Sequence, residues 1–286
     1  MEMGIAEMPL ALFSTFAPIG AGAFAVLAAA FLTTSFDKDD LKRIDKLTLV
    51  PLCFAVFGFV ASFFHLASPG NAFGVFAATG TSPLSNEILA GVVFMAAAIV
   101  YWIVAMTGKL GAGARKGFAC VVAVLGIVFA AFTGAAYMID TISSWNTALV
   151  PLEMIGFALV GGGAVGVMTL GFAGVQAKLD GRFGTSAMAL LIVGAVLGIV
   201  LAVMQTTGVS GMQNYVMDGA DVVSGVTMWM ACGAVLVAAA CVFGVMAARG
   251  KSMTTFGVTA TVLAVAGILV LRIVFYATEF SVGLAI

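Results

Sequence analysis

Charged side chains are scarce in this sequence of 286 residues. Asp, Glu, Lys and Arg together make up 9% of the chain, whereas hydrophobic residues make up 63%. A water-soluble domain of this length needs far more surface charge, so the composition excludes a soluble globular protein. The formal net charge of -1 also excludes the basic surface that nucleic-acid binding needs. Because each membrane span takes roughly 20 apolar residues, the sequence predicts a single polytopic membrane domain over residues 1–286.

Residues that bind metal ions are equally scarce. The chain has one His, His65, and four Cys that lie in apolar runs without a Cys-x-x-Cys pair: Cys53, Cys120, Cys232 and Cys241. An iron–sulfur cluster needs clustered thiolates, and a structural zinc site needs four nitrogen or sulfur ligands. A membrane b-haem that bridges two helices usually takes two His. We therefore expect no metal ion and no haem in this chain, and we expect the Cys to be small buried hydrophobes.

Hydropathy predicts eight membrane-spanning helices and an all-α integral membrane fold. Their approximate bounds are Pro9–Thr34, Ile44–Leu66, Leu84–Thr107, Lys116–Ile139, Leu149–Gln176, Thr185–Thr207, Val222–Ala248 and Met253–Thr278. The residues before the first helix include Glu2 and Glu7 but no Lys or Arg. They lack the positive start of a signal peptide, so we expect the first helix to be retained.

Positive charges occur only in alternate loops. All but one of the 12 Lys and Arg residues follow the first, third, fifth and seventh helices: Lys38, Lys42, Arg43, Lys46, Lys109, Arg115, Lys116, Lys178, Arg182, Arg249 and Lys251. The loops after the second, fourth and sixth helices contain none. Positive loops face the cytoplasm, so we expect both termini on the extracytoplasmic side.

The candidate functional residues are polar groups expected near the extracytoplasmic edge of the membrane. His65 ends the second helix and Glu87 begins the third. Arg272, the remaining cation, lies late in the eighth helix, and Tyr276 follows one turn later on the same face. Ionisable groups in such places are costly and are functional candidates by default. Because a His and a tuned carboxylate both accept protons, we interpret His65 and Glu87 as groups that bind and deprotonate a quinol.

Structural roles remain open for the same residues. His65 can anchor the end of its helix at the membrane interface. Glu87 can belong to a helix N-terminus that begins at Ser85 or Asn86, where an acid suits the helix dipole. Arg272 can extend its head group to the interface, or it can be the counter-ion of Glu87 or Glu279.

Several local motifs occur in a fixed order along the chain. They are the Glu-x-Pro-Leu start (Glu7, Pro9 and Leu10), HLASPGNAF (His65–Phe73), SPLSNEILAG (Ser82–Gly91), DTISSWNT (Asp140–Thr147) and RIVFYATEFSVGLAI (Arg272–Ile286). With the chain length and the eight spans, they resemble the DmsC-type membrane anchor subunits of bacterial dimethyl sulfoxide reductases. The resemblance covers essentially the whole chain.

The resemblance implies an anchor that oxidises menaquinol in the cytoplasmic (inner) membrane of a bacterium and releases protons outside. It implies that electrons pass to an iron–sulfur subunit and then to a molybdopterin catalytic subunit, so those cofactors are expected in the partners. The quinol-site His and Glu of the family correspond by motif to His65 and Glu87. We expect Ser85, Asn86, Arg272 and Tyr276 to complete the binding site. The anchor itself then carries no terminal reductase chemistry.

Three other functions remain open. An anchor of a polysulfide reductase-like complex does the same work for another acceptor. A secondary transporter places its polar site near the membrane midplane, often on broken helices, whereas the midplane of this protein is nearly free of charge. A purely structural anchor needs neither His65 nor Glu87. The terminal acceptor, the quinone type and the direction of electron flow are not encoded in these residues.

Overall fold

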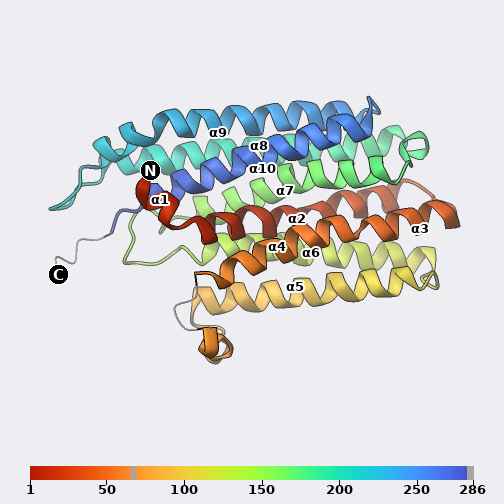
Figure 1. The fold of residues 1–286 in the computed structure, drawn as a ribbon, viewed down its shortest axis with the longest axis horizontal. Helices are drawn as coiled ribbons and strands as arrows, with labels where there is room; N and C mark the ends of the chain where they lie inside the picture. The colour runs from red at the N-terminus through yellow and green to blue at the C-terminus, as the bar shows by residue number, and fades with distance from the viewer. Residues whose placement is uncertain (66–68, 282–286) are drawn as a thin grey trace.

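A computed structural model of the protein describes residues 1–65 and 69–281, without the side chains of residues 2, 3 and 69–73. Its helices include eight spans that are long and apolar enough to cross a membrane, as predicted (Figure 1). They are α2 (Met8–Thr33), α3 and α4 together (Lys38–Leu47 and Leu49–Phe63), α5 (Pro83–Met106), α6 (Ala112–Ala135), α7 (Leu149–Phe172), α8 (Gly181–Gly208), α9 (Gly219–Ala248) and α10 (Met253–Ala277). The parts of the motifs at residues 66–68 and 282–286 lie outside the described residues.

Short helices occupy several of the connections. They are α1 (Glu2–Ala6) and the 3-10 helices η1 (Pro69–Ala78), η2 (Gln176–Lys178) and η3 (Val209–Gly211). The described residues form no strand beyond two isolated bridges. The all-helical fold class is therefore confirmed over the part of the protein that the structure describes.

Two largely buried helices, α2 and α7, form the centre of the bundle (Figure 1). The helices α4, α5 and α6 lie on one side of this pair, and α8, α9 and α10 lie on the other. The two central helices meet through glycine: a Cβ on Gly22 would lie 1.8 Å from the Ala158 carbonyl oxygen, and one on Gly162 would lie 2.3 Å from the Gly22 carbonyl carbon. Small residues allow membrane helices to approach this closely, so the central contact depends on Gly at both positions.

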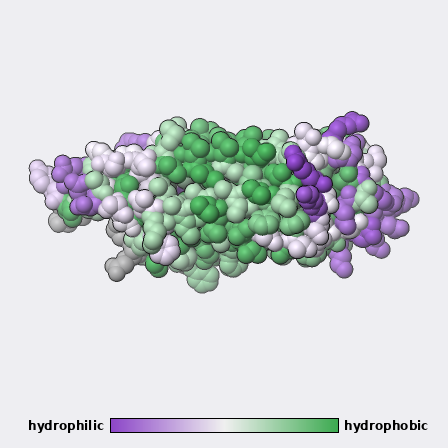
Figure 2. Space-filling view, turned by 90° about the horizontal axis from the view of Figure 1, so that it is seen from above, coloured by the Kyte–Doolittle hydropathy of each residue, from purple (hydrophilic) through white to green (hydrophobic). Residues whose placement is uncertain are grey.

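The two ends of the bundle differ in charge. The N-terminus and the end of α10 lie at one end, which we call the terminal end, and the loops rich in Lys and Arg lie at the other, which we call the basic end (Figure 1). Figure 2 shows a hydrophobic band between them, with the strongest hydrophilic colouring at the basic end. The predicted alternation of the loops is thus present in the fold.

The amphipathic helix α3 closes the basic end. Its N-terminus is capped by the Asp37 carboxylate, and Lys178 from the α7–α8 connection bonds to Asp37 and Asp40. Further along α3, the buried Asp45 forms an ion pair with Arg115. Arg115 was expected in a loop, but it lies in the first turn of α6, which begins four residues earlier than predicted, directly after Gly111 as its N-cap.

Other helix ends also differ from the prediction. The helix α5 begins with Ser82 as its N-cap and Pro83 in its first position, rather than at Ser85 or Asn86. Pro favours the first position because its missing N–H has no helical partner there. The helix α7 ends at Phe172 instead of Gln176, since Gly174 adopts a left-handed backbone with φ 68°.

The expectation of buried cysteines was wrong for two of the four. Cys53 and Cys232 are exposed on the sides of α4 and α9, and Cys120 and Cys241 are only partly covered. A thiol is apolar enough to face lipid, so hydropathy does not separate a Cys in the core from one on the bundle surface.

We predict that Gly22→Ala lowers the stability of the bundle by at least about 1–3 kcal/mol, because its new methyl group meets backbone atoms that cannot move aside. Gly225→Ala is the matched control, since a Cβ at Gly225 in α9 meets nothing within 4 Å. Circular dichroism against temperature in detergent measures both. Equal unfolding midpoints for Gly22→Ala and wild type would contradict the glycine contact.

Candidate functional site

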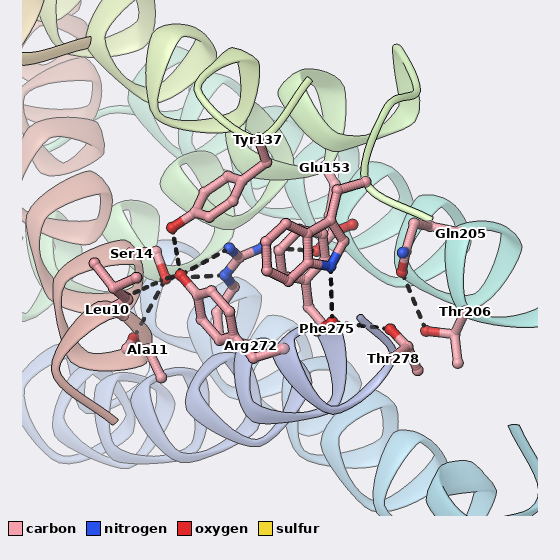
Figure 3. A network of polar contacts seen from close by, with 12 residues as sticks. Leu10, Ala11, Ser14, Tyr137, Glu153, Gln205, Thr206, Arg272, Phe275 and Thr278 are labelled. Carbon is pink, nitrogen blue, oxygen red and sulfur yellow. Dashed lines mark hydrogen bonds and ion pairs between the residues drawn. The ribbon is translucent and has the colours of Figure 1, made fainter. Parts of the chain in front are cut away.

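A buried arginine organises the terminal end of the bundle. Arg272, in the last two turns of α10, has no exposed surface. Its Nε donates to the Ser14 hydroxyl at 2.9 Å, and its Nη2 donates to the Tyr276 hydroxyl at 3.3 Å (Figure 3). Ser14 in turn donates to the Leu10 carbonyl oxygen at 2.7 Å. The predicted proximity of Arg272 and Tyr276 on one helix face is therefore present.

The ion-pair partner of Arg272 is Glu153, near the start of α7. The distance from Arg272 Nη1 to Glu153 Oε1 is 3.7 Å, and Glu153 is 1% exposed. This pairing corrects the expectation that Arg272 is the counter-ion of Glu87 or Glu279. Neither carboxylate oxygen of Glu153, nor Arg272 Nη1, has a hydrogen-bond partner among the described residues.

Aromatic side chains enclose the arginine. Its guanidinium lies 4.0 Å from the Phe275 ring centre and 5.2 Å from that of Tyr137. Trp145, from the loop after α6, stacks on Phe275 with a centroid distance of 5.1 Å and donates its indole N–H to the Phe275 carbonyl oxygen at 3.2 Å. The hydroxyls of Tyr137 and Tyr276 bond to each other. Burial raises the pKa of the Tyr137 phenol well above its usual value, so this side chain remains a neutral donor.

Glu87 lies above a stack of phenylalanines. Gly91, one turn after Glu87 on the same face of α5, packs so closely that a Cβ there would lie 2.8 Å from the Phe59 ring. Phe59 of α4 stacks on Phe129 of α6 with a centroid distance of 5.3 Å. The Glu87 carboxyl is therefore buried on the terminal-end side of these rings.

The Glu87 carboxyl is buried in the second turn of α5. Oε1 of Glu87 has no hydrogen-bond partner among the described residues. A buried polar atom left open in this way is suited to a polar ligand or an ordered water.

The two polar residues before Glu87 have different surroundings. Ser85 is buried, and its N–H faces the Ser82 hydroxyl at 3.4 Å. The side-chain oxygen of Asn86 accepts from the Gly80 N–H at 2.7 Å and thereby holds the preceding turn. Asn86 thus has a structural bond to the turn before α5.

His65 lies beside a carboxylate that the sequence analysis did not connect with it. Its Nδ1 lies 3.3 Å from Oε2 of Glu7, which precedes α2, and the His65 side chain is 47% exposed. Glu7 is 32% exposed. Partial burial raises the pKa of Glu279, and the nearby Glu7 carboxylate adds to that effect. His65, Glu7 and Glu279 therefore belong to the outer rim of the terminal end, while Glu87 and Arg272 lie inside.

Sequence reasoning identified Arg272, Tyr276 and Glu87 but missed Glu153, Ser14 and Tyr137. A signal for Glu153 was present, because it is an isolated acid in an otherwise apolar span. Ser14 and Tyr137 have no such signal, since hydroxyl groups are common in membrane helices. Within residues 1–65 and 69–281, no three His, Cys, Asp or Glu side chains converge as metal ligands. The absence of metal and haem stays a prediction.

Eight apolar helices with a buried polar cluster at one end define a polytopic membrane protein. The protein belongs to the family of DMSO reductase anchor subunits (DmsC), whose family model matches residues 1–278. It is therefore a membrane anchor subunit of the dimethyl sulfoxide reductase type, as its motifs indicated.

Individual relatives support the same assignment. The sequence is 31% identical over 294 residues to the C subunit of the anaerobic dimethyl sulfoxide reductase of Escherichia coli (strain K12), covering 100% of this protein and 99% of the relative. It is 28% identical over 293 residues to the subunit of the same name from Haemophilus influenzae (strain ATCC 51907 / DSM 11121 / KW20 / Rd), with the same coverage of 100% and 99%. The YnfH subunit of an anaerobic dimethyl sulfoxide reductase of Escherichia coli (strain K12) is 27% identical over 289 residues, again covering 100% and 99%.

We predict that Arg272→Met destabilises the protein by about 3–5 kcal/mol, because the substitution leaves Glu153 as a buried carboxyl without its counter-charge. Chemical unfolding in detergent micelles, followed by far-ultraviolet circular dichroism, measures the change. The exposed Arg249→Met at the end of α9 is the control and stays within about 0.5 kcal/mol of wild type. A wild-type midpoint for Arg272→Met would show that the pair contributes nothing to stability.

Proposed function

We propose that this protein binds menaquinol at the terminal end and oxidises it within a dimethyl sulfoxide reductase complex. The observation that carries the proposal is the Glu87 carboxyl, which is buried above the Phe59–Phe129 stack with one oxygen that has no hydrogen-bond partner among the described residues. An aromatic floor with a polar wall suits the flat ring and the two hydroxyls of a naphthoquinol. Membership of the anchor family supports a quinol over other flat ligands.

The proposed pocket lies among α2, α4, α5 and α6. The places of His65, Glu87 and Arg272 in the sequence predict a pocket between the second, third and eighth spans, which are α4, α5 and α10. However, α4 packs mainly on α2, α5 packs mainly on α6, and α10 packs mainly on α9 and α7. Arg272 on α10 is therefore not a wall beside α4. Ser85 and Asn86 lie at the mouth of the pocket, and Tyr276 acts by holding Arg272.

His65 and Glu7 form a carboxylate–histidine pair at the rim. The carboxylate lies 3.3 Å from Nδ1, outside hydrogen-bond geometry, and its negative charge favours the tautomer with the proton on Nδ1, which leaves Nε2 to accept a proton. In the proposed reaction, the two O–H bonds of the quinol break and two electrons pass to an iron–sulfur cluster of the partner subunit. His65 and Glu87 receive protons, and His65 returns its proton to water because it is half exposed.

The proposed direction of proton release follows from the charge of the two ends. Positive loops remain in the cytoplasm, so the basic end faces the cytoplasm and the terminal end faces outward. Protons from the quinol are then released outside. The iron–sulfur and molybdopterin subunits bind at the terminal end, because electrons must leave close to the pocket.

The position of the buried charges also favours an anchor over a transporter. Glu87, Glu153 and Arg272 all lie in the helical turns nearest the terminal end, and the helices that carry them are continuous. Transporter sites near the midplane use broken helices.

We predict that His65→Ala and Glu87→Gln each abolish turnover driven by a short-chain naphthoquinol, because each removes a proton acceptor. Turnover driven by a reduced water-soluble dye, which feeds the iron–sulfur subunit directly, remains at the wild-type level and shows that the complex assembles. Asp221→Asn, an exposed acid in the first turn of α9 at the same end, is the matched control. Wild-type naphthoquinol oxidation by both variants would refute the proposed site.

Glu7→Gln is expected to slow naphthoquinol oxidation by roughly tenfold or more, because the amide no longer favours the His65 tautomer with a free Nε2. Inhibitor binding to the pocket changes little, since Glu7 contacts His65 and not the aromatic floor. Stopped-flow kinetics and fluorescence titration measure the two effects separately. An unchanged rate would show that His65 needs no orienting partner.

A further inference from the structure

We propose that a cleft between α6 and α8 binds an anionic phospholipid, with an acyl chain in the cleft and the phosphate bound by Lys116 and Arg182. The cleft lies in the half of the bundle nearest the basic end, so this site is separate from the proposed quinol site at the terminal end. The inference goes beyond the proposed function and does not depend on it.

The cleft has a volume of about 700 Å³ and an almost entirely apolar lining. Ala25, Ala28 and Ala29 of α2 form its floor, and residues 120–128 of α6 and 186–193 of α8 supply its walls. The cleft exists because the two walls pack elsewhere: α6 packs on α2, α5 and α7, whereas α8 packs mainly on α7 and α9. The alanine methyl groups of α2 are too short to fill the space between them.

The depth of the cleft matches the acyl chains of one leaflet. The helices α6 and α8 both begin at the basic end, at Ala112 and Gly181. At 1.5 Å per residue, the cleft starts roughly 8–12 Å below these helix starts and ends roughly 18–24 Å below them. An apolar cavity holds apolar groups in preference to water, so hydrocarbon is the ligand that suits it.

Two cations stand over the cleft on the helices that form its walls. Lys116 precedes Cys120 by four residues on α6, and Arg182 precedes Ser186 by four residues on α8. Residues four apart share a helix face, so both cations belong to faces that line the cleft, one turn nearer the basic end. Because helical side chains tilt toward the N-terminus, both also lean toward that end, where long basic side chains place their charge among the lipid head groups.

Both cations are available to a ligand. The neighbouring Lys178 and Arg115 bind carboxylates of α3 and its N-cap. Lys116 belongs to none of the ion pairs between described side chains. Arg182 lies 3.5 Å from Asp180, but its side chain is 86% exposed, and an exposed pair of this kind contributes little. Asp180 is itself held as the N-cap of α8. A phosphate can therefore bind both free cations above the apolar cleft.

Two other occupants fit the cleft less well. A transmembrane helix of a partner crosses roughly 30 Å of hydrocarbon, whereas the cleft extends for only about two helical turns. The isoprenoid tail of a quinol carries no charge for Lys116 and Arg182. The hydroxyl of Ser186 donates to the Arg182 carbonyl oxygen at 2.9 Å, so this residue adds no free donor to the wall. A flexible acyl chain beneath an anionic head group matches both the lining and the charge.

Cys120 provides a direct test because its thiol lines the cleft and is partly exposed. The test measures how fast N-ethylmaleimide labels each Cys of this chain in the complete reductase complex in detergent micelles, with peptide mapping to assign the label. We expect dioleoylphosphatidylglycerol to slow the labelling of Cys120 at a mole fraction at least about fivefold lower than dioleoylphosphatidylcholine needs. Labelling of the exposed Cys53 and Cys232 is the internal control and is the same with either lipid.

Lys116→Gln combined with Arg182→Gln removes the charges that bind the phosphate. The mole fraction of phosphatidylglycerol that halves the labelling rate of Cys120 then rises at least about tenfold, since each cation near an anionic head group contributes roughly fivefold. Lys109→Gln combined with Lys251→Gln is the matched control. It removes two exposed cations at the same end, neither of which belongs to a helix face that lines the cleft, and it keeps the wild-type value.

The inference fails if the two phospholipids protect Cys120 equally, or if neither protects it. Protection by a long-chain naphthoquinone in place of phosphatidylglycerol would assign the cleft to a quinol tail. An unchanged preference for phosphatidylglycerol in the variant without Lys116 and Arg182 would place the phosphate elsewhere. If Cys120 does not react even in lipid-free micelles, native mass spectrometry decides, and equal retention of phosphatidylglycerol by wild type and this variant rejects the proposal.

Discussion

The burial of one guanidinium inside the membrane-spanning bundle constrains the whole terminal end. A charge removed from water costs several kcal/mol unless its surroundings replace the solvent. Around Arg272 this replacement comes from a hydroxyl of α2, a carboxylate of α7, a tyrosine of its own helix and the faces of aromatic rings. Because the partners come from separate parts of the sequence, one charge fixes how those parts meet. Pro18 of α2 affects the same place. It has no N–H to donate to the Ser14 carbonyl oxygen, so α2 lacks one helical hydrogen bond beside the residue that binds Arg272.

The eight spans and their alternating loops were predictable because hydropathy and loop charge are local properties. His65, Glu87 and Arg272 were also predictable as candidates, since an ionisable residue next to an apolar run is conspicuous. The pairing of Arg272 with Glu153 was not, because it joins helices that are far apart in the sequence and depends on how α7 and α10 pack. The pairing of His65 with Glu7 was hidden for the same reason. The start of α5 could have been predicted, since Ser82-Pro83 is a typical helix-capping sequence. The prediction followed the apolar pattern instead and placed the start at later residues.

The arrangement separates two kinds of polar group at one end of the bundle. The His65–Glu7 pair lies at the rim, where water reaches it, and the pair formed by Arg272 and Glu153 lies inside, where bulk solvent does not. Glu87 is buried as well, one turn before Gly91, which packs on the phenylalanine stack. A site that must hold an apolar ring and release protons needs both kinds of surroundings close together. The central helices α2 and α7 meet this need because both are buried along most of their length and both carry polar residues near the terminal end.

Trp145 gives the inner cluster a spectroscopic label of its own. The protein has three tryptophans, and the other two lie in different surroundings. Trp102 donates its indole N–H to the Asp45 carbonyl oxygen at the basic end, and Trp229 is 42% exposed on the side of α9. Trp145 alone stacks against Phe275 beside the buried guanidinium. In a variant with Trp145 as its single tryptophan, all tryptophan fluorescence would come from the cluster. The emission wavelength would then report the polarity around the indole, and the intensity would report quenching by an electron-accepting ligand bound nearby.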